Sequence, residues 1–160
     1  MTGKCEDISQ IFFLNVGNSK EHAEKAIGEL HIDKAVIISS IQLKDDVMDF
    51  IGSLTDRGVN VLETHYVDPF APESMRDIIS LILSIIERYS GHGVEFVAGL
   101  TGGTNIMAVA LGVVAMIKGF RCNYVLNKDD DFLLKIDIFK ELDRSVPLEQ
   151  IGMFFSDVRQ

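Results

Sequence analysis

The sequence has no tryptophan, three prolines and two cysteines among its 160 residues. The cysteines, Cys5 and Cys122, stand 117 positions apart, too few and too scattered for a disulfide framework or a thiolate zinc cluster. We therefore expect no metal site, no cofactor and a reducing environment for the folded chain.

Long apolar runs are also missing. A helix that crosses a bilayer needs about 20 consecutive apolar residues, and no uninterrupted apolar run here approaches that length. The first ten residues, MTGKCEDISQ, lack the apolar core of a secretory signal. These absences predict a soluble, cytoplasmic protein with no membrane partner.

Positive charge is scarce. Fifteen Lys and Arg residues stand against 24 Asp and Glu residues, so the formal net charge is −9. A chain this acidic would repel a long nucleic-acid duplex, and we expect no direct binding to duplex DNA. Hydrophobic residues make up 47% of the sequence, which excludes disorder and favours one compact domain. Small ligands held by local groups remain compatible with this composition.

Short apolar segments alternate with amphipathic ones, a pattern typical of a parallel sheet with crossover helices. Strands are expected at residues 11–16, 35–38, 59–67, 94–98, 121–126 and 132–139, and helices at 19–30, 44–56, from Pro72 to Gly91, and at 105–118. The pattern predicts an α/β, doubly wound, three-layer fold with a mainly parallel sheet.

The end of the chain is expected to depart from this alternation. A polar turn at residues 127–131 is too short for a parallel crossover, so the last strand is expected to be an antiparallel edge, guarded by Lys135 and Asp137. We expect the domain to cover residues 1–145. Residues 146–160, with Met153, Phe154 and Phe155, would form a tail or a short docking helix.

In a doubly wound sheet the ligand crevice lies outside the carboxyl ends of the strands. The candidate loops are therefore residues 17–20, Ser39 with Ser40, residues 68–70, and residues 99–105. Among the four histidines, only His65 lies near a strand end that faces this predicted crevice.

The segment Thr101-Gly102-Gly103-Thr104 follows a predicted buried strand and opens a helix. Glycines there can bring backbone N–H groups toward an anion, which the helix dipole also favours. Ordinary turn and cap chemistry explains the same residues equally well. Neither GxxxxGK[ST] nor GxGxxG is present, which disfavours a common nucleoside triphosphate or NAD site.

The helix expected at 105–118 is apolar nearly all round. Such a helix must be covered on two sides, by its own sheet and by either another helix or a second subunit. A central core helix in a monomer and a helix buried in a dimer are both consistent with the pattern.

The segment VAGLTGGTNIMAVALGVVAMIKG resembles the strand, turn and helix of CRISPR-associated Rossmann-fold (CARF) sensor domains, in which a TGGT-type loop precedes a Met-containing apolar helix. LNVGNSKEHAEKAI and HYVDPFAPESM are weaker similarities. The resemblance covers about residues 10–140, and its sharp motif is Thr101 to Met107.

The resemblance implies a homodimer that binds cyclic oligoadenylate, commonly cyclic tetra-adenylate, across its two-fold axis. By that resemblance Gly102, Gly103, Thr104 and Asn105 would hold phosphates. The loop residues Gly17, Asn18 and Ser19 would line the ring or its adenine pocket. The hydroxyls of Ser39 and Ser40 would add polar contacts.

The resemblance leaves three functions open. The chain could be a sensor, a metal-independent ring nuclease, or the ligand-binding part of a regulator without its winged helix. Cleavage in the family proceeds by attack of a ribose 2′-hydroxyl on the neighbouring phosphate, and the candidates to assist it are Ser19, Lys20 and Asn105. Cleaving members often carry a Lys where this sequence has Asn105, and a neutral amide cannot offset a full charge.

Overall fold

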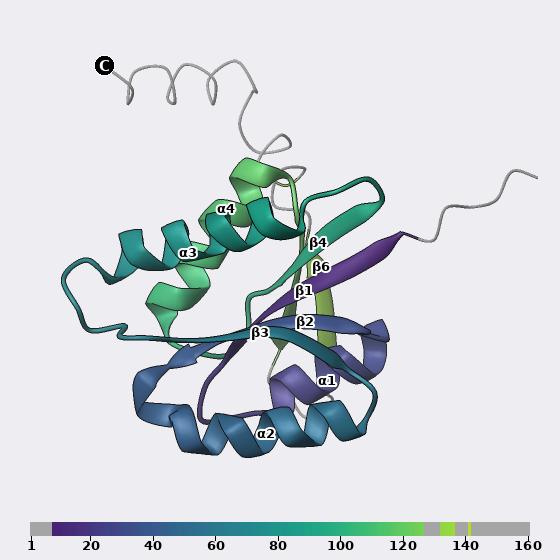
Figure 1. Ribbon diagram of the computed structural model, residues 1–160, viewed down its shortest axis with the longest axis horizontal. Coiled ribbons are helices and arrows are strands. Elements are labelled where there is room, and N and C mark those ends of the chain that lie inside the picture. Colours follow the sequence, from purple (N-terminus) through teal and green to yellow (C-terminus); the bar gives the residue numbers. More distant parts are fainter. Residues whose placement is uncertain (1–7, 127–131, 137–140, 142–160) are drawn as a thin grey trace, which may run out of the picture.

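A twisted sheet with helices on both faces forms the fold (Figure 1). The computed structural model describes residues 8–126, 132–136 and 141. The strands are β1 (Ser9–Val16), β2 (Lys34–Ser40), β3 (Asn60–Val67), β4 (Val94–Gly99), β5 (Arg121–Leu126) and β6 (Phe132–Ile136). The helices are α1 (Glu21–Leu30), α2 (Lys44–Asp56), α3 (Ser74–Tyr89) and α4 (Asn105–Lys118), with the 3-10 turn η1 (Ile41–Leu43) before α2.

The strands follow the order β3-β2-β1-β4-β5-β6. Strands β1 to β5 run parallel to one another, and β6 pairs antiparallel with β5, from Cys122 opposite Ile136 to Leu126 opposite Phe132. The structure confirms the predicted α/β architecture with its parallel sheet between helical layers. Because β1 to β4 run in one direction, their carboxyl ends share one edge, on the left of Figure 1.

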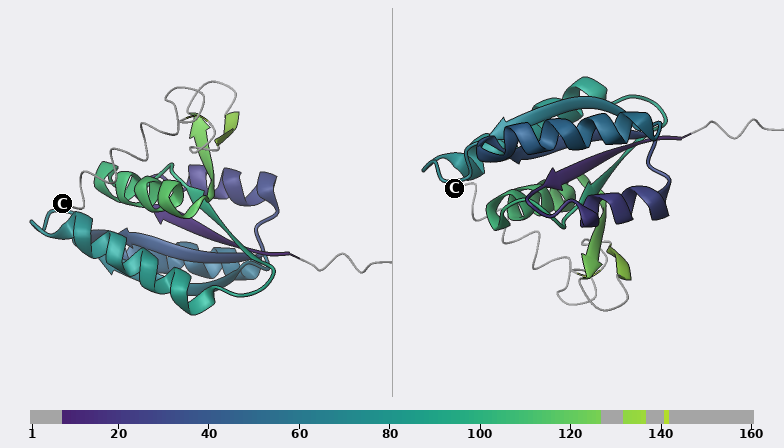
Figure 2. Two further views of the ribbon diagram at one scale, coloured as in Figure 1. Left: turned by 90° about the horizontal axis from the view of Figure 1, so that it is seen from above. Right: turned by 90° about the horizontal axis from the view of Figure 1, so that it is seen from below.

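Two apolar cores lie on opposite faces of the sheet, because side chains alternate along each buried strand. On β1, Ile11 and Phe13 pack toward α3 and α4, whereas Phe12, Leu14 and Val16 pack toward α1 and α2. Figure 1 shows α3 and α4 above the sheet and α1 and α2 below it. Figure 2 shows the molecule from above, with α3 and α4 nearer the viewer, and from below, with α1 and α2 nearer. The strand expected at 11–16 is thus buried on both faces.

Helix starts differ from those expected. The first helix begins at Glu21, with Lys20 at its N-cap, and Ser19 makes no cap bond to the backbone. Its hydroxyl instead donates to the Glu21 carboxylate. Similarly, α3 begins at Ser74, so Pro72 precedes the helix instead of occupying its first turn. A backbone bond from the Ser74 N–H to the Ala71 carbonyl forms a turn just ahead of α3.

Several predictions fall outside the described residues: the polar turn at 127–131, the side chains of Lys135 and Asp137, and the tail at 146–160. Within the described ranges, none of the helices combines the length and apolar character needed to span a bilayer.

Candidate functional site

The sheet changes its winding direction between β1 and β4. From β1 the chain passes through α1 to β2 on one side, and from β4 it passes through α4 to β5 on the other. The loops that leave these adjacent strands go to opposite faces, and in doubly wound α/β folds the ligand crevice lies at this switch point, outside the carboxyl ends of the strands. The structure therefore brings together the β1–α1 loop and the Thr101–Asn105 segment, as predicted.

The turn between β4 and α4 depends on two glycines in left-handed conformations, Gly102 with φ +96° and Gly103 with φ +66°. A Cβ on Gly102 would collide with the Asn15 carbonyl oxygen at the end of β1. A Cβ on Gly17 would lie 2.9 Å from the Gly103 nitrogen. The two loops thus pack backbone against backbone, with no room for side chains between them.

Two hydrogen bonds tie this turn to β5. The Val125 N–H donates to the Thr101 hydroxyl oxygen at 2.6 Å, and the Leu100 N–H donates to the Asn123 carbonyl at 2.9 Å. They extend the β4–β5 pairing, whose last paired residues are Gly99 and Asn123. The first threonine of the motif therefore positions the turn.

At the N-terminus of α4 the polar groups remain largely unused. Thr104 occupies the N-cap with extended backbone (φ −89°, ψ 160°), yet its side chain makes no cap bond. Its hydroxyl oxygen is buried and has no hydrogen-bond partner among the described residues. Asn105, the first helical residue, is exposed. A helix N-terminus with free N–H groups attracts an anion, so this end of α4 suits a phosphate.

The β1–α1 loop carries the other predicted contacts. Gly17 is half-buried, and Asn18 and Ser19 are exposed. The hydrogen bond from the Ser19 hydroxyl holds the pKa of the Glu21 carboxyl below its usual range. Lys20 reaches sideways, and its ammonium donates to the Asp46 carbonyl at 2.7 Å, in the first turn of α2.

Ser39 and Ser40 end the neighbouring strand β2, but both hydroxyls are engaged within the protein. Ser39 is fully buried and donates to the Val16 carbonyl at 2.7 Å, and Ser40 donates to the Gln42 side-chain oxygen at 2.6 Å. In the structure Ser39 therefore supports the end of β1, beneath the loop that carries Gly17.

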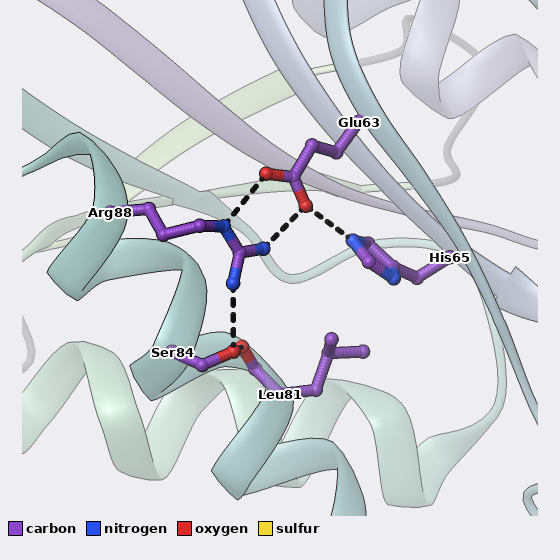
Figure 3. A network of polar contacts seen from close by, with 5 residues as sticks. All are labelled: Glu63, His65, Leu81, Ser84 and Arg88. Atoms are coloured by element: carbon purple, nitrogen blue, oxygen red, sulfur yellow. Dashed lines mark hydrogen bonds and ion pairs between the residues drawn. The ribbon is translucent and has the colours of Figure 1, made fainter.

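His65 belongs to a separate polar network on β3 and α3 (Figure 3). Its Nε2 lies 2.6 Å from a Glu63 carboxylate oxygen, which also accepts a 2.6 Å hydrogen bond from Arg88. A second Arg88 nitrogen donates to the other oxygen at 3.1 Å. The guanidinium lowers the pKa of Glu63 from 4.5 to about 2. This network ties the edge strand to α3.

Two buried side-chain amides near the turn between β4 and α4 are not among the residues predicted from the sequence. Asn15 and Asn123 are each 2% exposed. Neither atom of the Asn15 amide has a hydrogen-bond partner in the part of the chain that the structure describes, and the same holds for the Asn123 amide nitrogen. The sequence signal for Asn15 is that it is the one polar residue in the apolar run IFFLNV. A polar residue in a buried strand is informative because buried polar groups normally have hydrogen-bond partners.

Elsewhere, the described residues contain no group of three or more His, Cys, Asp or Glu side chains that could hold a metal ion. A hollow of about 330 Å³ lies at the opposite edge of the sheet and is lined by residues such as His31, Asp33 and Arg57. It is distant in the topology from the β1–β4 crevice, because those residues follow the carboxyl ends of α1 and α2.

No protein-family model matches the chain, and no curated protein matches its sequence. Solved structures share its fold. One is Can2 from Sulfobacillus thermosulfidooxidans in complex with cyclic tetra-adenylate, with a TM-score of 0.66 and 16% sequence identity over 81% of this chain. Another is protein VC1899 from Vibrio cholerae, with a TM-score of 0.70 and 12% identity over 82% of this chain. A third is Enterococcus italicus Csm6 bound to cyclic hexa-2′-fluoro-hexa-dAMP, with a TM-score of 0.66 and 12% identity over 85% of this chain. The chain spans 35%, 34% and 42% of those chains, respectively.

Proposed function

We propose that this chain is a CARF-type sensor domain that binds cyclic oligoadenylate, with cyclic tetra-adenylate as the expected ring, in type III CRISPR signalling. The observation that carries the proposal is the switch point between β1 and β4, where the Gly102–Gly103 turn presents the N-terminus of α4. Two solved structures with this fold hold a cyclic oligonucleotide, which supports the assignment of the ligand class.

The chemistry of the crevice fits a ring of phosphates and bases. Backbone N–H groups and the unpaired Thr104 hydroxyl can donate to phosphate oxygens without a basic surface. A net charge of −9 is therefore compatible with this ligand, although it disfavours a long duplex. In this proposal Gly102, Gly103 and Asn105 hold phosphate.

The proposal includes a homodimer, because a ring is most simply embraced by matching loops from two subunits. Helix α4 leaves Val109 54% exposed and Ile117 61% exposed, two turns apart on one face. Tyr124 on β5 is also 40% exposed. An apolar face of this kind on the helix that begins at the site would be covered by the same face of a second copy.

Binding without cleavage fits the crevice better than a ring nuclease does. The two candidate catalytic side chains in the β1–α1 loop are already bonded, Ser19 to Glu21 and Lys20 to the Asp46 carbonyl. Asn105 is neutral and contributes no charge to a developing oxyanion. Beside the turn, the described residues therefore offer hydrogen-bond donors for a phosphate but no positioned cation.

The test is to mix the purified chain with cyclic tetra-adenylate, cyclic hexa-adenylate or linear tetra-adenylate, and to record the melting temperature and chromatograph the nucleotide. We expect the cyclic tetra-adenylate to raise the melting temperature and to be recovered intact. Linear products would instead support the ring nuclease. No shift with either ring would overturn the proposal.

A matched variant localises the binding. Thr104→Val removes a hydroxyl that has no hydrogen-bond partner among the described residues, so we expect the melting temperature to stay within about 2 °C of the wild type while ring affinity falls several-fold. Thr55→Val is the control, because Thr55 lies on the exposed side of α2 and its hydroxyl donates only to the Ile51 carbonyl. Equal ring binding by wild type and Thr104→Val would place the phosphates elsewhere.

A further inference from the structure

Asn15 is a polar residue at a position of β1 where the alternation of the strand predicts a buried apolar side chain. On the face of β1 that points toward α3 and α4, the preceding side chains are the core residues Ile11 and Phe13. Asn15 follows at the next position of the same face and is 2% exposed. Its carboxamide oxygen and nitrogen both lack a hydrogen-bond partner among the residues that the structure describes.

An unpaired carboxamide in this position lowers stability, because both of its polar atoms lose their hydrogen bonds to water on folding. A leucine, whose branched end has nearly the same shape, would avoid that loss. The carboxamide therefore requires a hydrogen-bond partner that the described residues do not supply.

Asn15 lies directly beneath the turn at the crevice. A Cβ on Gly103 would be 3.2 Å from the Asn15 Cβ, and a Cβ on Gly102 would strike the Asn15 carbonyl oxygen. The turn residues are themselves half-buried, and they pack against the backbone and the Cβ of Asn15. Both glycines of the turn lack a side chain and have wide backbone freedom, which permits the turn to shift.

The two free atoms indicate which part of a nucleotide would pair with them. A phosphate offers acceptors only, so it would pair with the amide nitrogen and leave the oxygen unsatisfied. The N6 amino group and N7 of adenine offer one donor and one acceptor side by side, and asparagine pairs with both at once. The nearby Thr104 hydroxyl and helix N-terminus remain for phosphate.

We propose that Asn15 is the base-reading residue of the site: its carboxamide accepts from adenine N6 and donates to adenine N7 when the Gly102–Gly103 turn moves aside. This inference rests on the proposed function, since it names the group that distinguishes adenine within the same crevice. It assigns the selection of the base to the end of β1 and the holding of phosphate to the start of α4.

The test compares cyclic tetra-adenylate with the same ring built from 7-deaza-adenine, which lacks the N7 acceptor. Isothermal titration calorimetry is run with the wild type, Asn15→Leu and Asn15→Ala. We expect the wild type to prefer the adenine ring at least about fivefold, and both variants to bind the two rings equally. Asn15→Leu should also melt no lower than the wild type. If Asn15→Leu fails to fold, Asn15→Ala tests the same prediction.

Asn60→Leu is the control, because it removes an exposed asparagine at the start of β3, at the other end of the sheet, and should keep the preference. A wild type that does not distinguish the two rings, or an Asn15 variant that keeps the full preference, overturns the role of Asn15 while cyclic oligoadenylate binding stands. Failure of the wild type to bind either ring overturns the proposed function itself.

Discussion

Gly102 shows how a single residue fixes the shape of the crevice. Its φ of +96° suits glycine, and the carbonyl oxygen of Asn15 occupies the space that a Cβ would take. Gly103 is similarly confined, with the Met107 Cε 3.0 Å from its Cβ position. At these two positions the site depends on the absence of a side chain more than on any functional group.

We expect Gly102→Ala to lower the free energy of unfolding by about 2–4 kcal/mol, because the new methyl group combines left-handed backbone strain with a collision against the Asn15 carbonyl oxygen. Urea denaturation measures the change. Gly52→Ala is the matched control: Gly52 lies within α2 with open space around it, so alanine there should stabilise by up to about 1 kcal/mol. An unchanged Gly102→Ala protein would contradict the described turn.

At the scale of elements, the site depends on how the β4–α4 turn is held against β5. The Thr101 hydroxyl accepts the Val125 N–H at 2.6 Å, beyond the last paired residues of β4 and β5. The Thr101 side chain thus adds one more hydrogen bond between β4 and β5 where the backbone pairing of these strands has ended. This arrangement keeps the turn fixed on its β5 side while its other side packs on β1.

Thr101→Val keeps the shape of the side chain but leaves the Val125 N–H unpaired. We expect a loss of about 1–3 kcal/mol in unfolding free energy and faster amide hydrogen exchange at Val125. Thr101→Ser keeps the hydroxyl and should restore protection at that amide. Equal exchange at Val125 in all three proteins would show that the bond contributes nothing.

The network of Glu63, Arg88 and His65 ties the edge strand β3 to α3 (Figure 3). The folded pKa of Glu63, about 2, lies below its ordinary value of 4.5, so the carboxylate stabilises the fold fully above pH 4.5. That contribution is lost as the pH falls from about 4.5 toward 2.

We therefore expect Glu63→Gln to melt a few degrees lower than the wild type at pH 7, and to lose less stability between pH 5 and 2. Thermal unfolding followed by circular dichroism across this range gives both values. Glu95→Gln is the control, because Glu95 is 45% exposed in its ion pair with Arg121 and such pairs contribute little. Parallel pH curves for wild type and Glu63→Gln would contradict this role.

At the scale of the whole molecule, the sheet order determines what the site contains. With β1 and β4 adjacent, loops separated by more than 80 positions in the sequence meet backbone to backbone. One copy leaves Val109 and Ile117 of α4 uncovered. The proposed second copy would complete both the apolar packing and the ring of loops.

Val109→Glu places a charge on that face without disturbing the core, because Val109 is 54% exposed. We expect the variant to elute as a monomer in size-exclusion chromatography with light scattering, with its circular dichroism unchanged and its ring affinity reduced. Met48→Glu, at a 56% exposed position of α2, should remain a dimer. A wild type that is monomeric at all concentrations would overturn the dimer.

The sequence was sufficient where local chemistry decides. Helix α4 begins at Asn105 and ends at Lys118 with Gly119 in the left-handed conformation, as its pattern and its glycine predict. The sequence was not sufficient where the role of a side chain depends on its hydrogen-bond partner in the folded chain. Ser39 is a candidate ligand contact in the sequence, yet its hydroxyl donates to the Val16 carbonyl, and the Ser19 hydroxyl donates to the Glu21 carboxylate instead of capping α1.

The sequence by itself determined the alternation of strands and helices, because hydrophobic period and turn residues act over a few positions. It also placed the TGGT turn at the carboxyl end of a strand. Only the tertiary structure decided the strand order, and with it the meeting of Gly17 with Gly103 and the burial of Asn15 beneath the turn. Those contacts join distant segments, and their energies depend on packing that no local pattern encodes.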